Sequence, residues 1–302
     1  MTTDFKVSVV YFLLYTELYA GTAKKFSIND ADRILIFASD ENLDLLVRRR
    51  QWLVDGTFKC SPSVFNQLFT LHVYMAGSVV QVVYALLPNY KTQTTYQRML
   101  TEFCKLRLFD PETIMTDFEQ AIMSAFRSLF PSISQSGCFY HFSQCMYRQV
   151  QQHGLQKLSY YVAEDFPLFI RMLAAIAFVP VTDAVDSFDT VVDAGYPDRV
   201  EPVVNYFEDN FFGWPDRRGN RRNTVFPLTL WNVNRRVVES LPRTNNSVEG
   251  WHGGFQSSLQ CSRPTLWKLL DQLIWENELH RLTVAQLLAA NTHSETCLPH
   301  YK

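Results

Sequence analysis

The sequence predicts an α/β protein with a mixed five-stranded sheet flanked by helices. Three strand-like apolar runs follow one another in the first third of the chain, and two further short strands, each followed by a helical pattern, come after them. Three antiparallel strands followed by two strand–helix crossovers make a mixed sheet with helices on both faces. The order of the elements therefore indicates the fold class.

The first three strands are expected at residues 52–59, 66–76 and 79–88. Gly77-Ser78 joins the second strand to the third as a short hairpin turn. Apolar side chains alternate along one face of the second strand, as in a strand with one covered face: Phe69, Leu71, Val73 and Met75. We therefore expect three antiparallel neighbours.

The remaining core elements alternate between helix and strand. We expect a helix at 93–108, a strand at 113–117, a helix from Phe118, a strand at 134–140 and a helix at 141–153. The first of these helices carries its apolar residues on one stripe, as a helix packed on a sheet does: Tyr96, Met99, Leu100 and Phe103.

Four segments are predicted along the chain. They are an N-terminal helical segment (1–50), a core made of two pieces (51–154 and 241–262), a mostly helical insertion rich in prolines (155–240), and a C-terminal helix and tail (263–302). In the first segment, Ser27 to Asp30 are expected to cap a helix that reaches Phe37. In a core helix, Gly253-Gly254 costs about 1 kcal/mol per glycine, which tight packing on the sheet could offset.

Composition and charge exclude several protein classes. The 302 residues have a net charge of −2, which argues against a strongly basic nucleic-acid coat protein. No apolar run reaches the roughly 18 residues of a membrane span, and the N-terminus does not resemble a signal peptide. The six cysteines are scattered without a Cys-x-x-Cys pair, which favours free thiols in a reducing compartment. We therefore expect an intracellular protein that is not embedded in a membrane.

Three acidic residues are candidates for chemistry. Asp55 lies within the strand-like run 52–58, Asp117 ends the strand 113–117, and Glu249 lies at the start of a helical pattern. A carboxylate inside an apolar run needs a compensating partner, and a metal ion is one such partner. Three converging carboxylates would form an all-oxygen site for Mg²⁺ or Mn²⁺, which assist phosphoryl transfer on nucleic acid.

Each acid also has an ordinary structural interpretation. Asp55 could be salt-bridged or capped, Asp117 could cap the helix that follows it, and Glu249 could be an exposed helix residue. Glu119, two residues after Asp117, is the nearest competing acid, and we expect its side chain to point away from the site.

Nearby histidines and cysteines are assigned supporting roles. Cys138 and His141 could begin a zinc site, but two ligands fall short of the four that a structural zinc needs. The alternatives are packing of the thiol and support of the adjacent helix. His252, three residues after Glu249, could orient the carboxylate, contact DNA or be a hydrogen-bonded structural residue. His72 is expected to be structural.

Arginines and tryptophans of the insertion are candidates for contacts with DNA. The arginines could hold a phosphate backbone in a salt-sensitive way, or could form a solvated face: Arg217, Arg218, Arg221 and Arg222. Trp214 or Trp231 could stack on an unpaired base, although core packing is the more common role of such tryptophans.

Four short stretches carry a family resemblance. They are Val54 to Lys59 (VDGTFK), Thr116 to Ala121 (TDFEQA), Gly137 to Gln144 (GCFYHFSQ) and Asn245 to His252 (NNSVEGWH). In this order they resemble the transposase domain of Mutator-like elements (MULE). The resemblance is close over about residues 50–155 and returns over 240–260.

The resemblance implies a ribonuclease H-like fold with a helical insertion before the third acid. It also implies a DDE-type DNA transposase in which Asp55, Asp117 and Glu249 are catalytic and hold two Mg²⁺ or Mn²⁺ ions, while Cys138 and His141 match the family's Cys-x-x-His motif. The implied partners are transposon ends and target DNA, bound by a homo-oligomer in the nucleus, with no small-molecule substrate. Family members often carry an N-terminal zinc module, and residues 1–50 contain no Cys/His cluster with ligand spacing.

Two other functions stay open at this point. The chain could be a host-captured, catalytically silent module that binds DNA or protein. It could also be a metal-dependent nuclease that cleaves DNA without strand transfer.

Overall fold

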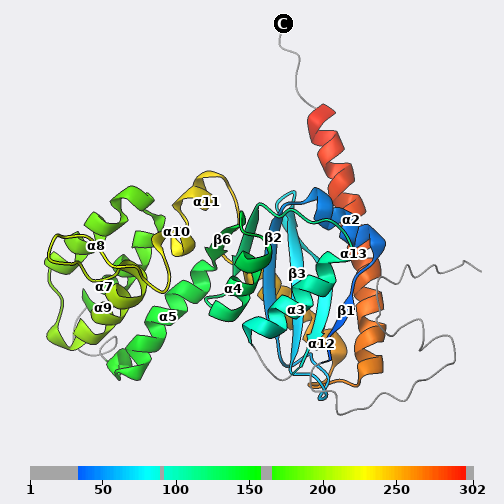
Figure 1. Cartoon of the computed structure of the whole chain (residues 1–302), viewed down its shortest axis with the longest axis horizontal. Helices are drawn as coiled ribbons and strands as arrows, with labels where there is room; N and C mark the ends of the chain where they lie inside the picture. The colour runs from blue at the N-terminus through cyan, green and yellow to red at the C-terminus, as the bar shows by residue number, and fades with distance from the viewer. Residues whose placement is uncertain (1–32, 89–91, 158–164, 297–302) are drawn as a thin grey trace, which may run out of the picture. The chain divides into compact units, whose positions relative to one another are not determined.

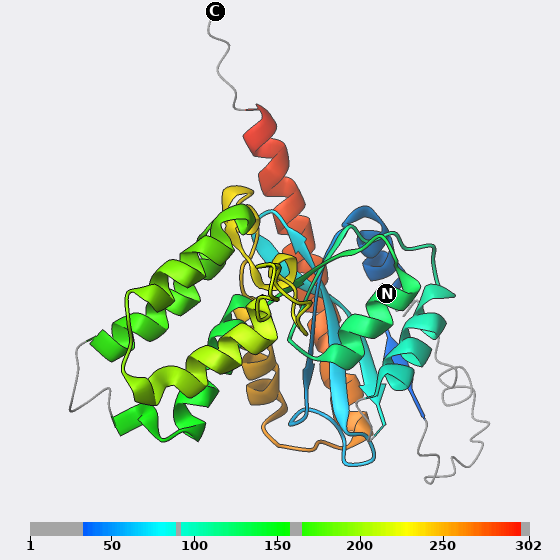
Figure 2. The same cartoon turned by 60° about the vertical axis from the view of Figure 1, so that its left-hand side comes forward.

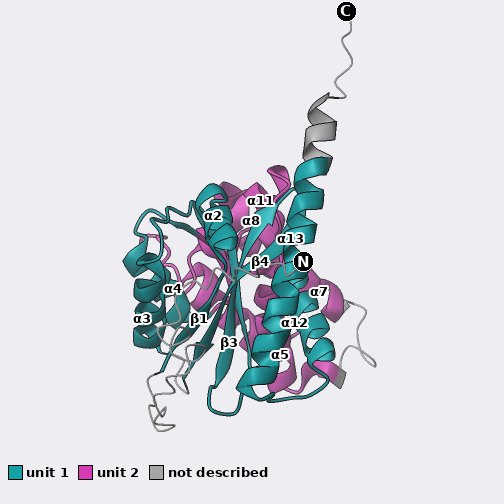
Figure 3. Ribbon diagram, turned by 90° about the vertical axis from the view of Figure 1, so that its right-hand side faces the viewer, with its two compact units in different colours: residues 1–114, 119–134, 246–302 teal, residues 115–118, 135–245 magenta. Residues whose placement is uncertain are grey.

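The computed structural model describes residues 33–88, 92–157 and 165–296 (Figure 1). The expected cap at Ser27 to Asp30 lies outside the described residues. The chain divides into two compact units, shown in different colours in Figure 3. Unit 1 comprises residues 1–114, 119–134 and 246–302, and unit 2 comprises residues 115–118 and 135–245. The domain boundaries inferred from the sequence stay predictions.

A six-stranded sheet has the order β1-β4-β3-β2-β5-β6. Its strands are β1 (Leu35–Phe37), β2 (Gln51–Thr57), β3 (Gln67–Met75), β4 (Ser78–Leu87), β5 (Thr113–Thr116) and β6 (Ser134–Gly137). The first four in the sheet order pair antiparallel. At their starts, Thr113 donates its N–H to the carbonyl of Arg50, and Ser134 to that of Glu112, so the last two run parallel to β2. The predicted mixed α/β sheet is confirmed, with one strand more than expected.

The additional strand corrects the prediction for the N-terminal segment. Residues 35–37 were expected at the end of a helix, but they form β1, in which Leu35 lies opposite Leu86 of β4. Their sequence, Leu-Ile-Phe, suits a strand that extends a sheet edge. Helix α2 (Asp40–Arg48) follows, and the side chain of Ser39 caps it by accepting the N–H of Asn42 at 3.2 Å.

One face of the sheet in unit 1 is covered by α3 (Gln93–Cys104) and α4 (Gln120–Leu129), as Figure 3 shows. Trp52 on β2 is buried against this layer, where its ring meets Phe103, Phe109 and Phe130 edge to face. Because side chains alternate along a strand, residues at odd positions of β2 face the other layer. Asp55 is one of them.

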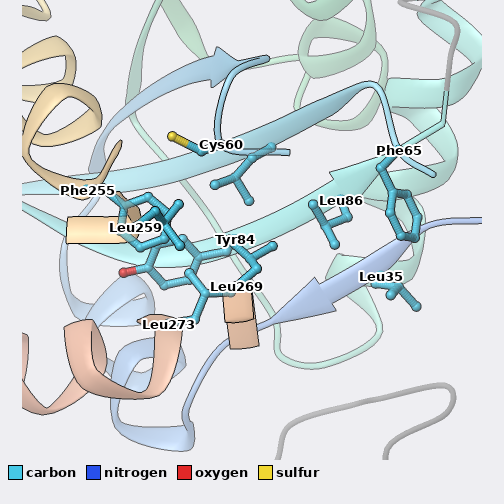
Figure 4. Packing of buried hydrophobic residues seen from close by; sticks show 10 residues of the cluster. Leu35, Cys60, Phe65, Tyr84, Leu86, Phe255, Leu259, Leu269 and Leu273 are labelled. Carbon is cyan, nitrogen blue, oxygen red and sulfur yellow. The ribbon is translucent and has the colours of Figure 1, made fainter. Parts of the chain in front are cut away.

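The other face is covered by α12 (Asn246–Leu259) and α13 (Leu266–Thr296). Phe255 and Leu259 of α12 and Leu269 and Leu273 of α13 pack on Tyr84 of β4 in the core cluster of Figure 4. The expected tight packing of Gly253-Gly254 is wrong, because a Cβ added at either position would have nothing within 4 Å. None of the helices in the described residues is both long and apolar enough to cross a membrane.

Unit 2 is mainly helical (Figure 2). Its helices are α5 (Phe139–Gln152), α7 (Asp165–Ala175), α8 (Ala184–Asp193), α9 (Glu201–Phe207), α10 (Leu228–Trp231) and α11 (Asn234–Val238), with a π-helical turn at Glu208–Phe212. Its core is aromatic. Phe142 of α5 stacks on Trp231 with ring centroids 4.9 Å apart, and Phe207 and Phe211 pack around the pair.

Candidate functional site

Asp55 is the candidate acid on the sheet of unit 1. It lies on β2 with 11% of its side chain exposed. Its Oδ1 accepts the N–H of Gly56 at 2.7 Å, and its Oδ2 lies 3.3 Å from Nδ1 of His252 on α12. The packing of α12 on β2 brings this histidine to the strand. The backbone and the helix thus each fix one oxygen of the carboxylate.

A chain of polar contacts continues from His252 into the sheet. Nε2 of His252 lies 3.1 Å from the hydroxyl of Thr70, and that hydroxyl lies 2.8 Å from Nε2 of His72. Thr70 is directly opposite Asp55 in the β2–β3 register, and both Thr70 and His72 have no exposed surface. Burial lowers the pKa of His72 well below its usual value, so its ring is neutral.

Glu249 lies in the first turn of α12 and is partly exposed. His252 is three residues further along, so the two side chains leave the same side of the helix. Unit 1 therefore presents one acid from a strand and a second from the helix that packs on that strand.

Asp117 is the candidate acid of unit 2, directly after β5. Its Oδ1 lies 2.9 Å from Nδ1 of His141 and accepts the side-chain N–H of Asn245 at 3.3 Å. The thiol of Cys138 donates to Oδ1 of Asn245 at 2.8 Å, so the four side chains form one cluster. Asp117 is not the N-cap of α4, which is Glu119, and that interpretation is wrong.

The acidity of His141 is set by this cluster. Burial lowers the pKa of His141, but its bonds to Asp117 and Cys138 outweigh burial and raise the pKa to about 10. The imidazole is therefore a cation beside the Asp117 carboxylate. Cys138 itself is fully buried, as expected for a thiol that packs in the interior. Gly137 precedes it because a Cβ there would lie 2.4 Å from the ring of Phe118.

Two residues of these clusters were missed from the sequence: Thr70 and Asn245. Thr70 stood in a strand with no sign of a polar partner on α12. Asn245 opens the stretch NNSVEGWH, and its position directly before a helical pattern was the available signal.

Within residues 33–88, 92–157 and 165–296, no group of three or more His, Cys, Asp or Glu side chains could hold a metal ion. Asp55, Asp117 and Glu249 supply carboxylate oxygens, the donors that Mg²⁺ and Mn²⁺ prefer. The donor chemistry of the three acids fits such ions, and their joint action stays a prediction.

A hairpin-like loop of unit 2 carries the predicted DNA-binding arginines. Pro215 and Arg221 form an isolated bridge, and Oδ1 of Asp216 accepts the backbone N–H groups of Arg218 and Asn220 at 2.8 and 2.9 Å. The loop exposes one large aromatic ring and three guanidinium groups: Trp214, Arg217, Arg218 and Arg222.

Two of the predicted DNA contacts are corrected by their burial. Trp231 has no exposed surface and donates its indole N–H to the carbonyl of Phe211, so it cannot stack on a base. Only 14% of the Arg221 side chain is exposed, and its guanidinium pairs with Asp189 and Glu208. Both residues are structural: the tryptophan fills the core, and the arginine ties the loop to the helices beneath it.

Residues 51–145 match the family model of the MULE transposase domain. The resemblance inferred from the sequence is confirmed for this stretch, which contains Asp55, Asp117, Cys138 and His141. This part of the chain is thereby similar to transposases. No curated protein matches the chain.

Proposed function

We propose that this chain is the catalytic part of a DDE-type DNA transposase built on a ribonuclease H-like core. The family match over residues 51–145 carries the proposal, because it includes both candidate aspartates. The sheet supports it: Asp55 lies on β2, Asp117 directly follows β5, and these strands are neighbours in the sheet order.

The proposed catalytic residues are Asp55, Asp117 and Glu249, acting together on two Mg²⁺ or Mn²⁺ ions. When bound, such ions lower the pKa of the attacking group and neutralise charge on the leaving oxygen. The protein's task is to present ionised carboxylates in fixed orientations. Gly56 and His252 do this for Asp55, and Asn245 for Asp117.

The proposed reaction has two stages. Water first attacks a phosphorus at the transposon end, a new P–O bond forms, and the 3′-oxygen leaves as a hydroxyl. That 3′-hydroxyl then attacks a phosphorus of target DNA, and the target's own 3′-oxygen leaves. Both stages exchange one phosphodiester oxygen for another and need no redox partner.

The exposed loop of unit 2 is the proposed site of backbone contact with DNA. Arg217, Arg218 and Arg222 offer charge for phosphates, and Trp214 is 42% exposed and can stack on a base. Asp216 and Arg221 already hold the loop in one conformation, so the entropy cost of ordering the loop on DNA binding is small.

A cleavage and joining assay tests the proposed function. The full chain is incubated with Mn²⁺ and labelled DNA carrying the inverted repeats that flank the element encoding it. We expect cleaved ends and joined products, and we expect Asp55→Asn, Asp117→Asn and Glu249→Gln each to lower cleavage about 1,000-fold or more. Asp110→Asn removes a surface carboxylate that is 73% exposed and should leave cleavage unchanged.

The other outcomes identify the alternatives. Cleavage without joined products indicates a nuclease. DNA binding that Asp55→Asn leaves unchanged, with no cleavage by the unaltered chain, indicates a silent binding module. Full turnover in any one of the three acid variants would remove that residue from the proposed set.

A salt titration tests the loop. If its three exposed arginines contact phosphates, replacing Arg217, Arg218 and Arg222 with Gln should reduce the slope of log K against log[salt] by about 2 to 3. Replacing Arg33, Arg48 and Arg127 with Gln removes the same charge elsewhere in the chain. An equal slope in the two triple variants would exclude the loop from the interface.

A further inference from the structure

We infer that His252, Thr70 and His72 form a directed hydrogen-bond chain that positions the Asp55 carboxylate. The inference rests on the proposed role of Asp55 and deepens it by naming the residues that hold this acid. All four side chains belong to unit 1, on β2, β3 and α12.

Three contacts make up the chain. His72 Nε2 and Thr70 Oγ1 are 2.8 Å apart, Thr70 Oγ1 and His252 Nε2 are 3.1 Å apart, and His252 Nδ1 and Asp55 Oδ2 are 3.3 Å apart. The Thr70 hydroxyl also lies 3.2 Å from the backbone oxygen of Asp55. Its single proton therefore has three possible acceptors, which are this oxygen and Nε2 of either histidine.

Proton counting gives the chain a direction. The neutral ring of His72 has one N–H and one lone pair, and so does His252 when its ring is neutral. If Thr70 donated to His72 or to the backbone oxygen of Asp55, then His252 would use its N–H on Thr70 and turn a lone pair toward the carboxylate, which repels it. The opposite order gives all three contacts one donor and one acceptor. In that order His72 donates to Thr70, Thr70 to His252, and His252 to Asp55.

The far end of the chain agrees with this order. His72 has no exposed surface, and its Nδ1 has no hydrogen-bond partner among the residues that the structure describes. The Nε2–H tautomer uses the only N–H of the ring on Thr70. The other tautomer would bury an N–H without a partner, which is unfavourable.

The consequence for Asp55 is a fixed carboxylate. Gly56 N–H holds one of its oxygens and His252 Nδ1–H the other, so the side chain has little freedom to rotate. Thr70 lies on β3 directly opposite Asp55, and the sheet therefore sets the position of the histidine as well. Partners that orient a metal-binding carboxylate typically change metal affinity or activity about 10- to 100-fold when removed.

The test compares Thr70→Val with Thr70→Ser. Valine keeps the shape and removes the hydroxyl, whereas serine keeps the hydroxyl. Nitrogen NMR of the metal-free full chain reads the His252 tautomer, and electron paramagnetic resonance measures Mn²⁺ binding. We expect the Nδ1–H tautomer in the unaltered chain and in Thr70→Ser. In Thr70→Val we expect the tautomer population to shift and Mn²⁺ affinity to fall about 10-fold or more.

Two results would overturn the inference. One is an Nε2–H tautomer of His252 in the unaltered chain. The other is a Thr70→Val protein with unchanged Mn²⁺ affinity and an unchanged His252 spectrum. If Thr70→Val does not fold, His72→Phe keeps a ring in place and removes the first donor, and the same two readouts decide.

Asp55→Asn separates this inference from the proposed function. If Asp55→Asn leaves Mn²⁺ binding and cleavage intact, the proposed function fails whatever the histidine spectrum shows. If Asp55→Asn abolishes both and Thr70→Val changes neither readout, only the hydrogen-bond chain fails.

Discussion

Unit 1 and unit 2 hold their candidate aspartates by different means. Asp55 in unit 1 is 11% exposed, and a backbone N–H and the ring of His252 hold its two oxygens. Asp117 in unit 2 is 33% exposed and lies beside the imidazolium of His141. The deeper carboxylate is thus held between its own strand and a helix, and the shallower one lies beside a cation.

The difference extends to the surroundings of each acid. Unit 1 supports Asp55 with a sheet packed on leucines and aromatic rings, and burial lowers the pKa of its buried histidines His72 and His280. Unit 2 supports Asp117 with stacked aromatic rings and a partly buried ion pair between Arg221 and Glu208. Substitutions in the two units should therefore change the free energy of unfolding for different reasons.

The largest expected effect breaks the aromatic core of unit 2. Trp231→Ala removes a fully buried ring and should lower the free energy of unfolding by about 3 to 5 kcal/mol. Urea denaturation followed by circular dichroism measures the change. Trp214→Ala, which removes a half-exposed ring of the same unit, should cost far less, and equal losses would show that the stacking is not what stabilises unit 2.

The ion pair of unit 2 should be nearly as sensitive. Arg221→Met leaves the buried carboxylate of Glu208 without its cation, and we expect a loss of about 3 kcal/mol. Arg218→Met removes the same charge from the exposed side of the loop and should change stability by less than about 0.5 kcal/mol. Thermal unfolding of both variants tests whether Arg221 stabilises the unit or behaves like an exposed surface residue.

Acid should destabilise unit 1 through His280. Burial lowers the pKa of His280 from 6.5 to about 4, with Tyr84 and Glu276 facing the ring. Between these pKa values the unfolded chain takes up a proton that the folded chain does not, so stability falls as pH falls. We expect His280 to contribute a loss of about 2 kcal/mol between pH 7.5 and pH 5.

Denaturation of His280→Gln across the same pH range isolates this contribution. Glutamine does not titrate, so the pH slope should be shallower in the variant by that amount. Parallel curves for the variant and the unaltered chain would mean that the ring is not neutral in the folded state.

The smallest expected effect is stabilising. Gly253→Ala in unit 1 places a methyl group in open space on a helix and should add about 1 kcal/mol. Gly213→Ala in unit 2 should do the reverse, because its φ is +76° and the new Cβ would lie 2.0 Å from the carbonyl oxygen of Arg222. Differential scanning calorimetry should therefore show shifts of opposite sign.

Much of unit 1 could be predicted from local sequence. The β3–β4 hairpin follows from alternating side chains and from a glycine between the two strands. The register pairs Met75 with Ser78, so the turn is Ala76-Gly77, one residue before the predicted Gly77-Ser78. Strand β1 was missed because three residues carry no periodicity, and its partner β4 lies far along the chain. Local pattern predicts an element well only when the element is long enough to repeat it.

The supporting contacts could not be predicted because they join distant residues. Thr70 and His252 are 182 positions apart, and Asp117 and Asn245 are 128 positions apart. The burial of Arg221 likewise depends on Asp189 and Glu208, which no spacing rule connects to it. Asp55 was found because a carboxylate in an apolar run is conspicuous. Asp117 and Glu249 were assigned from their places at a strand end and a helix start, together with the family resemblance, and the joint action of the three acids awaits the cleavage assay.

The short outer strands of the sheet bear on how the protein behaves when it is concentrated. In the part of the chain that the structure describes, the sheet ends on β1 and β6, which have three and four residues. β6 reads Ser-Gln-Ser-Gly and offers little apolar surface to a foreign strand. Brief, polar borders of this kind discourage edge-to-edge aggregation.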